Sequence, residues 1–307
     1  MFRSYESFAC TEGGFLIAAV DRLAALSRRQ LPLLIGLQRR MFMSKKIQMV
    51  VLDWAGTTVD YGSLAPLDTM TAIFEAEGLS LAPHEINAYM GMAKRDHIAC
   101  LLTKAPGAEQ WLAKAGHPAS EGDIDALYGA FESQIEPAIL GHARLIDGVA
   151  EMTAALRARG LAVASTTGYT RAMIEALLPI AADQGYAPDC VVTGDDVASS
   201  RPAPFMIYEC MRQLNIYPAD RVVKVGDTVL DIGEGKNAGA LAIGVLEGSN
   251  LIGLSQATFE GLSKERQEAL CNEAREKYLA AGADMVIQRI ADLPAAIDTL
   301  NAQVGSR

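Results

Sequence analysis

A repeated alternation of short apolar runs and helical segments constrains the fold of this chain more than any other feature. Five runs have the character of buried strands, and four of them end in Asp, Thr or Gly: 47–52, 161–165, 190–193, 221–225 and 240–245. Apolar residues recur at helical spacing between these runs, over 148–159, 171–182 and 204–214. Such alternation is typical of right-handed βαβ units. We therefore expect an α/β fold with a doubly wound parallel sheet, whose ligands bind beyond the carboxyl ends of the strands.

The interval between the first two strands has a different pattern. It contains only helical segments: 67–77, 83–90, 94–102, 109–115 and 120–140. About eighty residues exceed any ordinary loop. We expect an inserted all-helical cap domain that lies over the crevice.

The remaining segments complete the expected domains. Residues 254–281 have the pattern of one helix, residues 284–287 of a short final strand, and residues 291–294 of the start of a closing helix. The expected domains are a core at 46–61 and 143–300, a cap at 62–142 and an N-terminal extension at 1–45.

The N-terminal extension differs from the rest in charge. Residues 1–42 contain six Arg, no Lys and three acidic residues, whereas the whole chain has a formal net charge of -10. Three acids argue against a transit peptide, and the longest apolar stretch is too short for a signal peptide. We expect the extension to be dispensable, with an upstream start codon that precedes a start at Met41 or Met43.

Charge and cysteine content exclude several classes of function. The net charge of -10 argues against a general nucleic-acid binder, which needs a basic surface. The five cysteines show no CxxC pair, which favours free thiols in a reducing compartment. No apolar run approaches the roughly twenty residues that span a bilayer. We expect a cytoplasmic protein with no nucleic-acid or membrane partner.

Polar residues with phosphoryl-transfer character follow the first two strands. Asp53 ends the first strand beside a Gly/Thr turn, where a carboxylate can act as a nucleophile. A lone strand-end Asp is commonly a turn or cap residue, but Thr166, Thr167 and Gly168 follow the second strand with hydroxyls and backbone amides. Arg201 adds a fixed cation that offsets charge on Asp53 and on phosphoryl oxygens.

Further carboxylates follow the fourth strand. Asp227 comes directly after this strand, and Asp231 lies four residues later. Because carboxylates gathered in one cleft repel each other, they need a cation, and hard oxygen ligands suit Mg²⁺. Asp231 either binds the metal through water or orients Arg201 or Lys224.

These motifs resemble the haloacid dehalogenase superfamily in their order along residues 47–250. Phosphatases of that superfamily usually carry a second Asp two residues after the nucleophile, where it protonates an oxygen leaving group. Ala55 occupies that position here. Cleavage of an ordinary phosphate ester is therefore disfavoured, and a different leaving group is implied.

Three segments, 53–62, 90–97 and 165–171, resemble the phosphonoacetaldehyde hydrolases (phosphonatases), and the resemblance covers residues 46–300. It implies that Lys94, in the cap, forms a Schiff base with the aldehyde of a small-molecule phosphonate. It also suggests a homodimer joined through the cap helices. Apolar cap residues such as Ile73 and Phe74 are numerous for one thin layer of helices, although they would also suit a core within the cap.

The chemistry agrees with this implication. A carbon–phosphorus bond breaks heterolytically when the carbon can hold the electron pair, and a protonated imine on Lys94 is such an electron sink. Asp53 would then accept the phosphoryl group, and water would release phosphate. Acetaldehyde would leave after protonation of the enamine and hydrolysis of the imine. This scheme needs no oxygen-directed acid at position 55.

Supporting roles follow from the same resemblance. Ala55 would lend its backbone carbonyl to Mg²⁺, which makes Asp53, Ala55 and Asp227 the expected metal ligands. His97 lies three residues after Lys94 and either shuttles protons or is a helix-surface histidine. Tyr169 either hydrogen-bonds near the imine or packs, and Met90 is either a core residue or a wall of the site.

Two other functions remain open. The first is a general haloacid dehalogenase-like phosphatase or phosphomutase, against which Ala55 argues. The second is a non-enzymatic binding protein built on a decayed hydrolase, against which the intact set of charged residues argues. Phosphate release from sugar phosphates and from phosphonoacetaldehyde distinguishes these alternatives.

Overall fold

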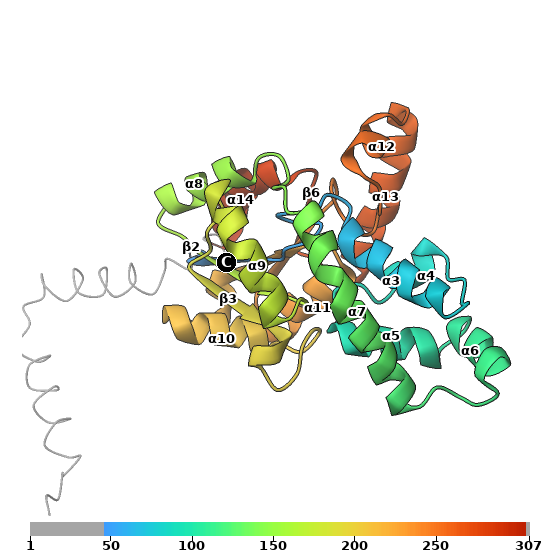
Figure 1. Cartoon of the computed structure of the whole chain (residues 1–307). Coiled ribbons are helices and arrows are strands. Elements are labelled where there is room, and N and C mark those ends of the chain that lie inside the picture. The colour runs from blue at the N-terminus through green and yellow to red at the C-terminus, as the bar shows by residue number, and fades with distance from the viewer. Residues whose placement is uncertain (1–45, 305–307) are drawn as a thin grey trace, which may run out of the picture. The chain divides into compact units, whose positions relative to one another are not determined.

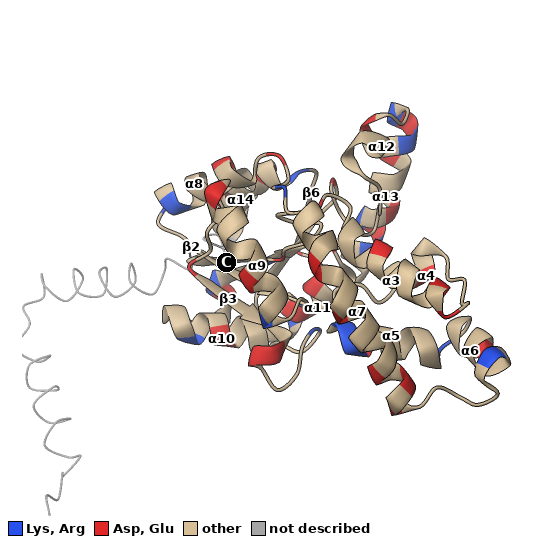
Figure 2. Cartoon of the chain, viewed as in Figure 1, with Lys and Arg blue, Asp and Glu red and all other residues tan. Residues whose placement is uncertain are grey.

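The computed structural model describes residues 46–304, which are coloured in Figure 1. The predictions for the extension at 1–45 lie outside the described residues and stay predictions. Charged residues of both signs are spread over the outer helices in the view of Figure 2. None of the described helices has the length and apolar character needed to cross a membrane.

The described strands form one parallel sheet in the order β3-β2-β1-β4-β5-β6. This confirms the doubly wound parallel sheet expected from the sequence. The second strand runs two residues further than predicted and includes both threonines, which pair with β3. The strands are β1 Met49–Leu52, β2 Ala162–Thr167, β3 Cys190–Thr193, β4 Val222–Gly226, β5 Leu241–Val245 and β6 Met285–Ile287.

Helices cover both faces of the sheet because side chains alternate along each strand. In β1, Val50 and Leu52 join one apolar cluster, and Met49 and Val51 join another on the opposite face. The first face is covered by α8 Val149–Ala158, α9 Arg171–Asp183 and α14 Leu293–Val304, and the second by α10 Phe205–Leu214 and α11 Val229–Ala238. Short 3-10 turns are η1 Gly194–Asp196, η2 Ala219–Arg221 and η3 Ile290–Asp292.

An all-helical insertion lies between β1 and β2, as predicted (Figure 1). Ser120 and Asp123 form a capping box at the start of its longest helix. Ile73 and Phe74 are buried within the insertion, so they form its own core and do not support a dimer interface. The helices are α3 Leu64–Ala76, α4 Pro83–Asn87, α5 Lys94–Thr103, α6 Gly107–Ala115 and α7 Glu121–Gly141.

The two connections between insertion and sheet lie side by side. The amide of Ile146 donates to the Thr58 carbonyl at 2.9 Å, and the amide of Asp60 donates to the Arg144 carbonyl at 3.3 Å. Val59 lies in an antiparallel bridge with Leu145 between these two bonds. A paired two-stranded connection constrains where the cap enters and leaves, whereas the domain boundaries at 62 and 142 stay predictions.

The prediction of one helix over 254–281 was wrong. The structure has two helices, α12 Gln256–Glu260 and α13 Lys264–Ala280, separated by residues 261–263. Ser263 begins the second helix, because its side chain accepts a hydrogen bond from the Arg266 amide at 3.3 Å. Gly261 ends the first, since glycine is a weak helix former.

Candidate active site

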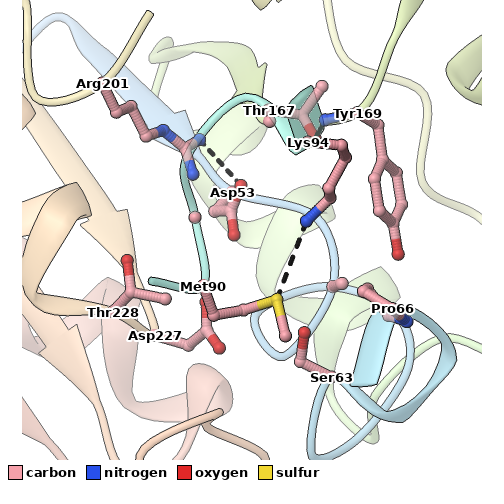
Figure 3. Close-up of a pocket in the computed structure, with 13 residues that line it drawn as sticks. Asp53, Ser63, Pro66, Met90, Lys94, Thr167, Tyr169, Arg201, Asp227 and Thr228 are labelled. Atoms are coloured by element: carbon pink, nitrogen blue, oxygen red, sulfur yellow. Dashed lines mark hydrogen bonds and ion pairs between the residues drawn. The ribbon is translucent and has the colours of Figure 1, made fainter. Parts of the chain in front are cut away.

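A small pocket lies where the carboxyl ends of β1, β2 and β4 meet the cap. Its free volume is about 20 Å³, which is room for about one water molecule. Figure 3 shows side chains from the sheet and from the cap pointing into this space. The lining residues are Asp53, Ala55, Ser63, Pro66, Met90, Gly91, Lys94, Thr167, Gly168, Tyr169, Arg201, Asp227 and Thr228.

Most of the residues predicted from the sequence therefore come together. Asp53, Ala55, Met90, Lys94, Thr167, Gly168, Tyr169, Arg201 and Asp227 all line the pocket. Thr166 and Asp231 lie directly behind it and contact Arg201. His97 does not line it. A strand-end position was a sufficient signal for Asp53, Thr167 and Asp227, because parallel strands end at one edge.

Asp53 is held at the end of β1 by the neighbouring strand. Its amide donates to the Val225 carbonyl at 3.0 Å, which continues the sheet register by one residue. The Thr58 hydroxyl donates to the Asp53 carbonyl at 3.0 Å and closes the following turn. These bonds fix the backbone, so that the carboxylate points into the pocket (Figure 3).

Three buried carboxylates form a cluster that fits a metal ion. Oxygens of Asp53, Asp227 and Asp231 all lie within 4.8 Å of one another. Burial and the neighbouring charges of Asp53 and Asp231 raise the pKa of Asp227 well above its usual value. The backbone amide of Asn250 donates to Asp227 Oδ2 at 2.8 Å and orients this carboxylate. Closely spaced carboxylates accept but do not donate hydrogen bonds, so a shared hard cation suits this donor set.

Arg201 connects the carboxylates behind the pocket. Its guanidinium contacts Asp53 Oδ1 at 2.7 Å, Asp231 Oδ1 at 3.0 Å and Glu234 Oε2 at 2.9 Å. A further contact of 2.6 Å reaches the Thr166 carbonyl. Burial alone would lower the pKa of Arg201, but Asp231 and the other carboxylates raise it, so the side chain stays charged.

Lys224 and Glu234 extend this network and were not predicted as site residues. Lys224 Nζ lies 3.0 Å from Asp231 Oδ1 and 3.2 Å from Glu234 Oε2, and both side chains are fully buried. Two signals pointed to them. Lys224 interrupts an apolar strand, and Glu234 lies three residues after Asp231 on the same helix face.

Asp231 forms ion pairs with Arg201 and Lys224, each at 3.0 Å, and its role at the site stays a prediction. Burial opposes its charge, but these two cations lower the pKa of Asp231 below its usual value. Its Oδ2 also accepts hydrogen bonds from the Thr228 amide at 3.1 Å and hydroxyl at 2.6 Å, which cap α11. The carboxylate therefore stays ionised while it holds both cations in place.

Lys94 is the first residue of α5 and projects from the cap into the pocket (Figure 3). Its Nζ lies 3.7 Å from the sulfur of Met90 and 5.6 Å from the centre of the Tyr169 ring. Burial lowers the pKa of Lys94 to about 8, although Asp53 acts in the opposite direction. A neutral amine, which is a nucleophile, is thus accessible near physiological pH.

The cap loop that leads to Lys94 rests on the backbone of the core. A Cβ atom at Gly168 would lie 2.8 Å from the Met92 carbonyl oxygen and 3.0 Å from that of Gly91. Glycine at position 168 is therefore required for this close approach. The helix predicted at 83–90 ends at Asn87, so Met90 lies in this loop as a wall of the pocket.

Tyr169 and His97 differ in their relation to Lys94. The Tyr169 ring packs beside the amine, and burial raises the pKa of its hydroxyl well above the usual value. His97 is fully buried, and its Nε2 lies 2.8 Å from the Ile86 carbonyl oxygen. Burial and Lys94 lower the pKa of His97 to about 3. The prediction of a helix-surface histidine was wrong, and a neutral ring bound to the backbone is poorly suited to shuttle protons.

Comparison with known families agrees with this geometry. The sequence profile of the family described as haloacid dehalogenase-like hydrolase matches residues 47–239. Two curated relatives named phosphonoacetaldehyde hydrolase come from Bacillus cereus (strain AH187) and Parabacteroides distasonis. They are 40% and 41% identical to this chain over 258 residues, which is 84% of this chain and 98% of each relative.

A solved structure has a similar fold throughout. The crystal structure of a phosphonoacetaldehyde hydrolase-like protein from Oleispira antarctica matches with a TM-score of 0.84 and 33% sequence identity. The match covers 86% of this chain and 95% of that one.

Proposed function

The chain belongs to the phosphonoacetaldehyde hydrolases of the haloacid dehalogenase-like hydrolase family, and from this premise we propose that it hydrolyses the carbon–phosphorus bond of phosphonoacetaldehyde to acetaldehyde and phosphate. The observation that carries the proposal is that Lys94 and Asp53 line the same small pocket, one from the cap and the other from the sheet. An amine activates the aldehyde end of such a substrate, and a carboxylate meets its phosphorus end.

Lys94 starts the reaction as a neutral amine. It attacks the aldehyde carbon, loss of water gives an imine, and uptake of one proton gives the protonated imine. The lowered pKa of Lys94 supports this role because only the uncharged amine is nucleophilic. Met90 and Tyr169 flank the amine.

Asp53 then attacks the phosphorus. The electron pair of the carbon–phosphorus bond moves onto carbon and is held as an enamine, while phosphorus becomes bonded to an Asp53 oxygen. Arg201, which contacts Asp53 at 2.7 Å, offsets the charge of the phosphoryl oxygens. Thr167 and Gly168 line the pocket and are the further residues that would bind these oxygens. Water hydrolyses the aspartyl phosphate. Protonation of the enamine and hydrolysis of the imine release acetaldehyde and restore Lys94.

Asp53, Asp227 and the Ala55 carbonyl are the proposed ligands of Mg²⁺. When bound, the ion balances the carboxylates and draws charge from the phosphoryl oxygens. The Asn250 amide keeps Asp227 in position for this task. Ala55 needs no acidic side chain because the leaving group is an enamine carbon rather than an alkoxide.

Release of both products from phosphonoacetaldehyde tests this proposal. Phosphate and acetaldehyde should appear in equal amounts with Mg²⁺ and fall sharply after chelation. Sugar phosphates serve as the comparison, since a general phosphatase or phosphomutase would act on them. Efficient turnover of sugar phosphates without turnover of phosphonoacetaldehyde would contradict the proposal.

A further inference from the structure

A buried lysine lies behind the pocket, in the middle of the otherwise apolar strand β4. Lys224 is fully buried, and its Nζ donates to the Thr166 hydroxyl at 2.7 Å. Its stem lies between the sheet and α11, where a Cβ atom at Gly235 would come within 2.9 Å of the Lys224 Cβ. Glycine thus lets the helix approach closely enough to enclose the lysine.

Lys224 is too far back to touch a substrate in the pocket, since it is not among the lining residues. Burying an ammonium group is unfavourable unless it is paired. Its partners are Asp231 and Glu234, and Arg201 binds the same two carboxylates. Two cations and two carboxylates therefore form a neutral set behind the pocket.

This neutral set defines the charge that faces the pocket. Asp53 and Asp227 remain as two adjacent carboxylates, and together they match the charge of one divalent cation. Without Lys224, the same region would carry one more negative charge. That charge would attract Mg²⁺ and repel a phosphoryl dianion, because electrostatic interactions in a buried site act over distances of several ångströms.

We propose that Lys224 is a positioning residue that balances the affinity of the site for Mg²⁺ against its affinity for the anionic substrate. This inference rests on the proposed function, because it takes Mg²⁺ and a phosphoryl group as the occupants of the pocket. Lys224 acts through Asp231 and Glu234: it offsets their charges, so that these two carboxylates repel the phosphoryl group less.

Two substitutions of opposite charge test this role. Lys224→Met removes a positive charge with similar shape, and Glu234→Gln removes a negative one. Mg²⁺ binding to the metal-free full chain, and then inorganic phosphate binding at saturating Mg²⁺, are measured by calorimetry at constant ionic strength. Lys224→Met should tighten Mg²⁺ binding and weaken phosphate binding, each by about tenfold or more. Glu234→Gln should shift both constants in the reverse directions.

The double variant distinguishes charge from structure. Lys224→Met with Glu234→Gln restores the net charge and should return both constants to within about threefold of wild type. Circular dichroism and thermal unfolding check the fold of each variant, and Glu234→Gln and the double variant still test the inference if Lys224→Met does not fold. If both single variants weaken both ligands, or the double variant restores neither constant, the residues act only structurally and the inference is wrong. A wild-type chain that binds no Mg²⁺ contradicts the proposed metal itself, which is a separate and recognisable result.

Discussion

At the scale of single residues, the pocket places an amine opposite a carboxylate. Lys94 comes from the cap and Asp53 from the end of β1, and little free space separates them. Burial makes the neutral form of Lys94 accessible, while Arg201 pairs with Asp53. Because their environments differ, Lys94 and Asp53 are suited to different steps of the proposed reaction: Lys94 to imine formation and Asp53 to phosphoryl transfer.

The first prediction concerns Lys94. Borohydride added with phosphonoacetaldehyde should inactivate the wild type irreversibly and label a peptide that contains Lys94, because the reagent reduces an imine. Lys94→Arg keeps the charge but cannot form an imine, so turnover should fall by at least about a thousandfold. Near-normal turnover of this variant, or absence of the label, would exclude the imine.

The pH dependence of the wild type follows from the same residue. Burial lowers the pKa of Lys94 to about 8, so the fraction of neutral amine grows as pH rises toward that value. We expect kcat/KM to increase with pH up to about 8 and to level off above it. A profile that is flat from pH 6 to 9 would contradict an attacking amine with this pKa.

The next prediction separates the phosphoryl acceptor from the imine. Asp53→Asn keeps the shape of the side chain and removes the nucleophile, so turnover should fall by orders of magnitude while borohydride still labels Lys94. Asp227→Ala should instead raise the Mg²⁺ concentration needed for activity. Retention of more than a few per cent of turnover by Asp53→Asn would require another phosphoryl acceptor.

At the scale of elements, two polar residues, Asp60 and His142, form a corner where the cap joins the sheet. Asp60 Oδ1 and Oδ2 accept hydrogen bonds from the Leu64 and Ala65 amides, each at 3.0 Å, and thereby cap the start of α3. His142, directly after α7, lies 3.2 Å from the same carboxylate. One side chain thus binds the first and last helices of the insertion.

The element-scale prediction tests this corner. Asp60→Ala should destabilise the protein by about 2 kcal/mol in urea unfolding, because it removes a helix cap at a residue with φ of 53°. Asp68→Ala, an exposed change on the same helix, is the control and should stay within about 0.5 kcal/mol.

The loss of unfolding free energy caused by Asp60→Ala should also depend on pH. The hydrogen bond to Asp60 raises the pKa of His142, so the stability it contributes is present at low pH and is lost as pH rises through the folded-state pKa. The loss caused by Asp60→Ala should therefore be larger at pH 5.5 than at pH 8.5. Equal losses for the Asp60 and Asp68 variants would show that the corner does not hold the cap.

At the scale of the whole molecule, the described residues already contain the complete sheet, insertion and pocket. The family profile begins at residue 47, close to the first strand at Met49. A chain that starts at Met43 should therefore express, fold and turn over like the full-length chain. A large loss of kcat or of thermal stability on this truncation would show that residues 1–42 belong to the fold.

The assembly prediction is a homodimer joined through the cap helices. Since Ile73 and Phe74 are buried, an interface must use exposed apolar residues such as Leu112 on α6 and Leu140 on α7. Sedimentation at micromolar concentration should give about twice the mass of 32.8 kDa. Leu140→Asp should weaken the dimer, and Leu279→Asp, an exposed change on α13, is the control. A wild-type species of only one chain would contradict the prediction.

The sequence by itself determined the parallel sheet, the inserted helices and most of the pocket. Strands of buried β-branched residues that alternate with helices leave few topologies, and parallel strands bring Asp53, Thr167 and Asp227 to one edge. The resemblance to a known family added Lys94, which no strand-end rule could place because it comes from the cap.

Only the tertiary structure decided the environment of each side chain. His97 has helical spacing from Lys94, yet it is buried against the Ile86 carbonyl, because the cap packs a second helix over that face. Glu234 pairs with both Arg201 and Lys224 only when β4 and α11 lie together. Local pattern specifies which element a residue belongs to, whereas its charge partners and burial depend on contacts between segments far apart in the chain.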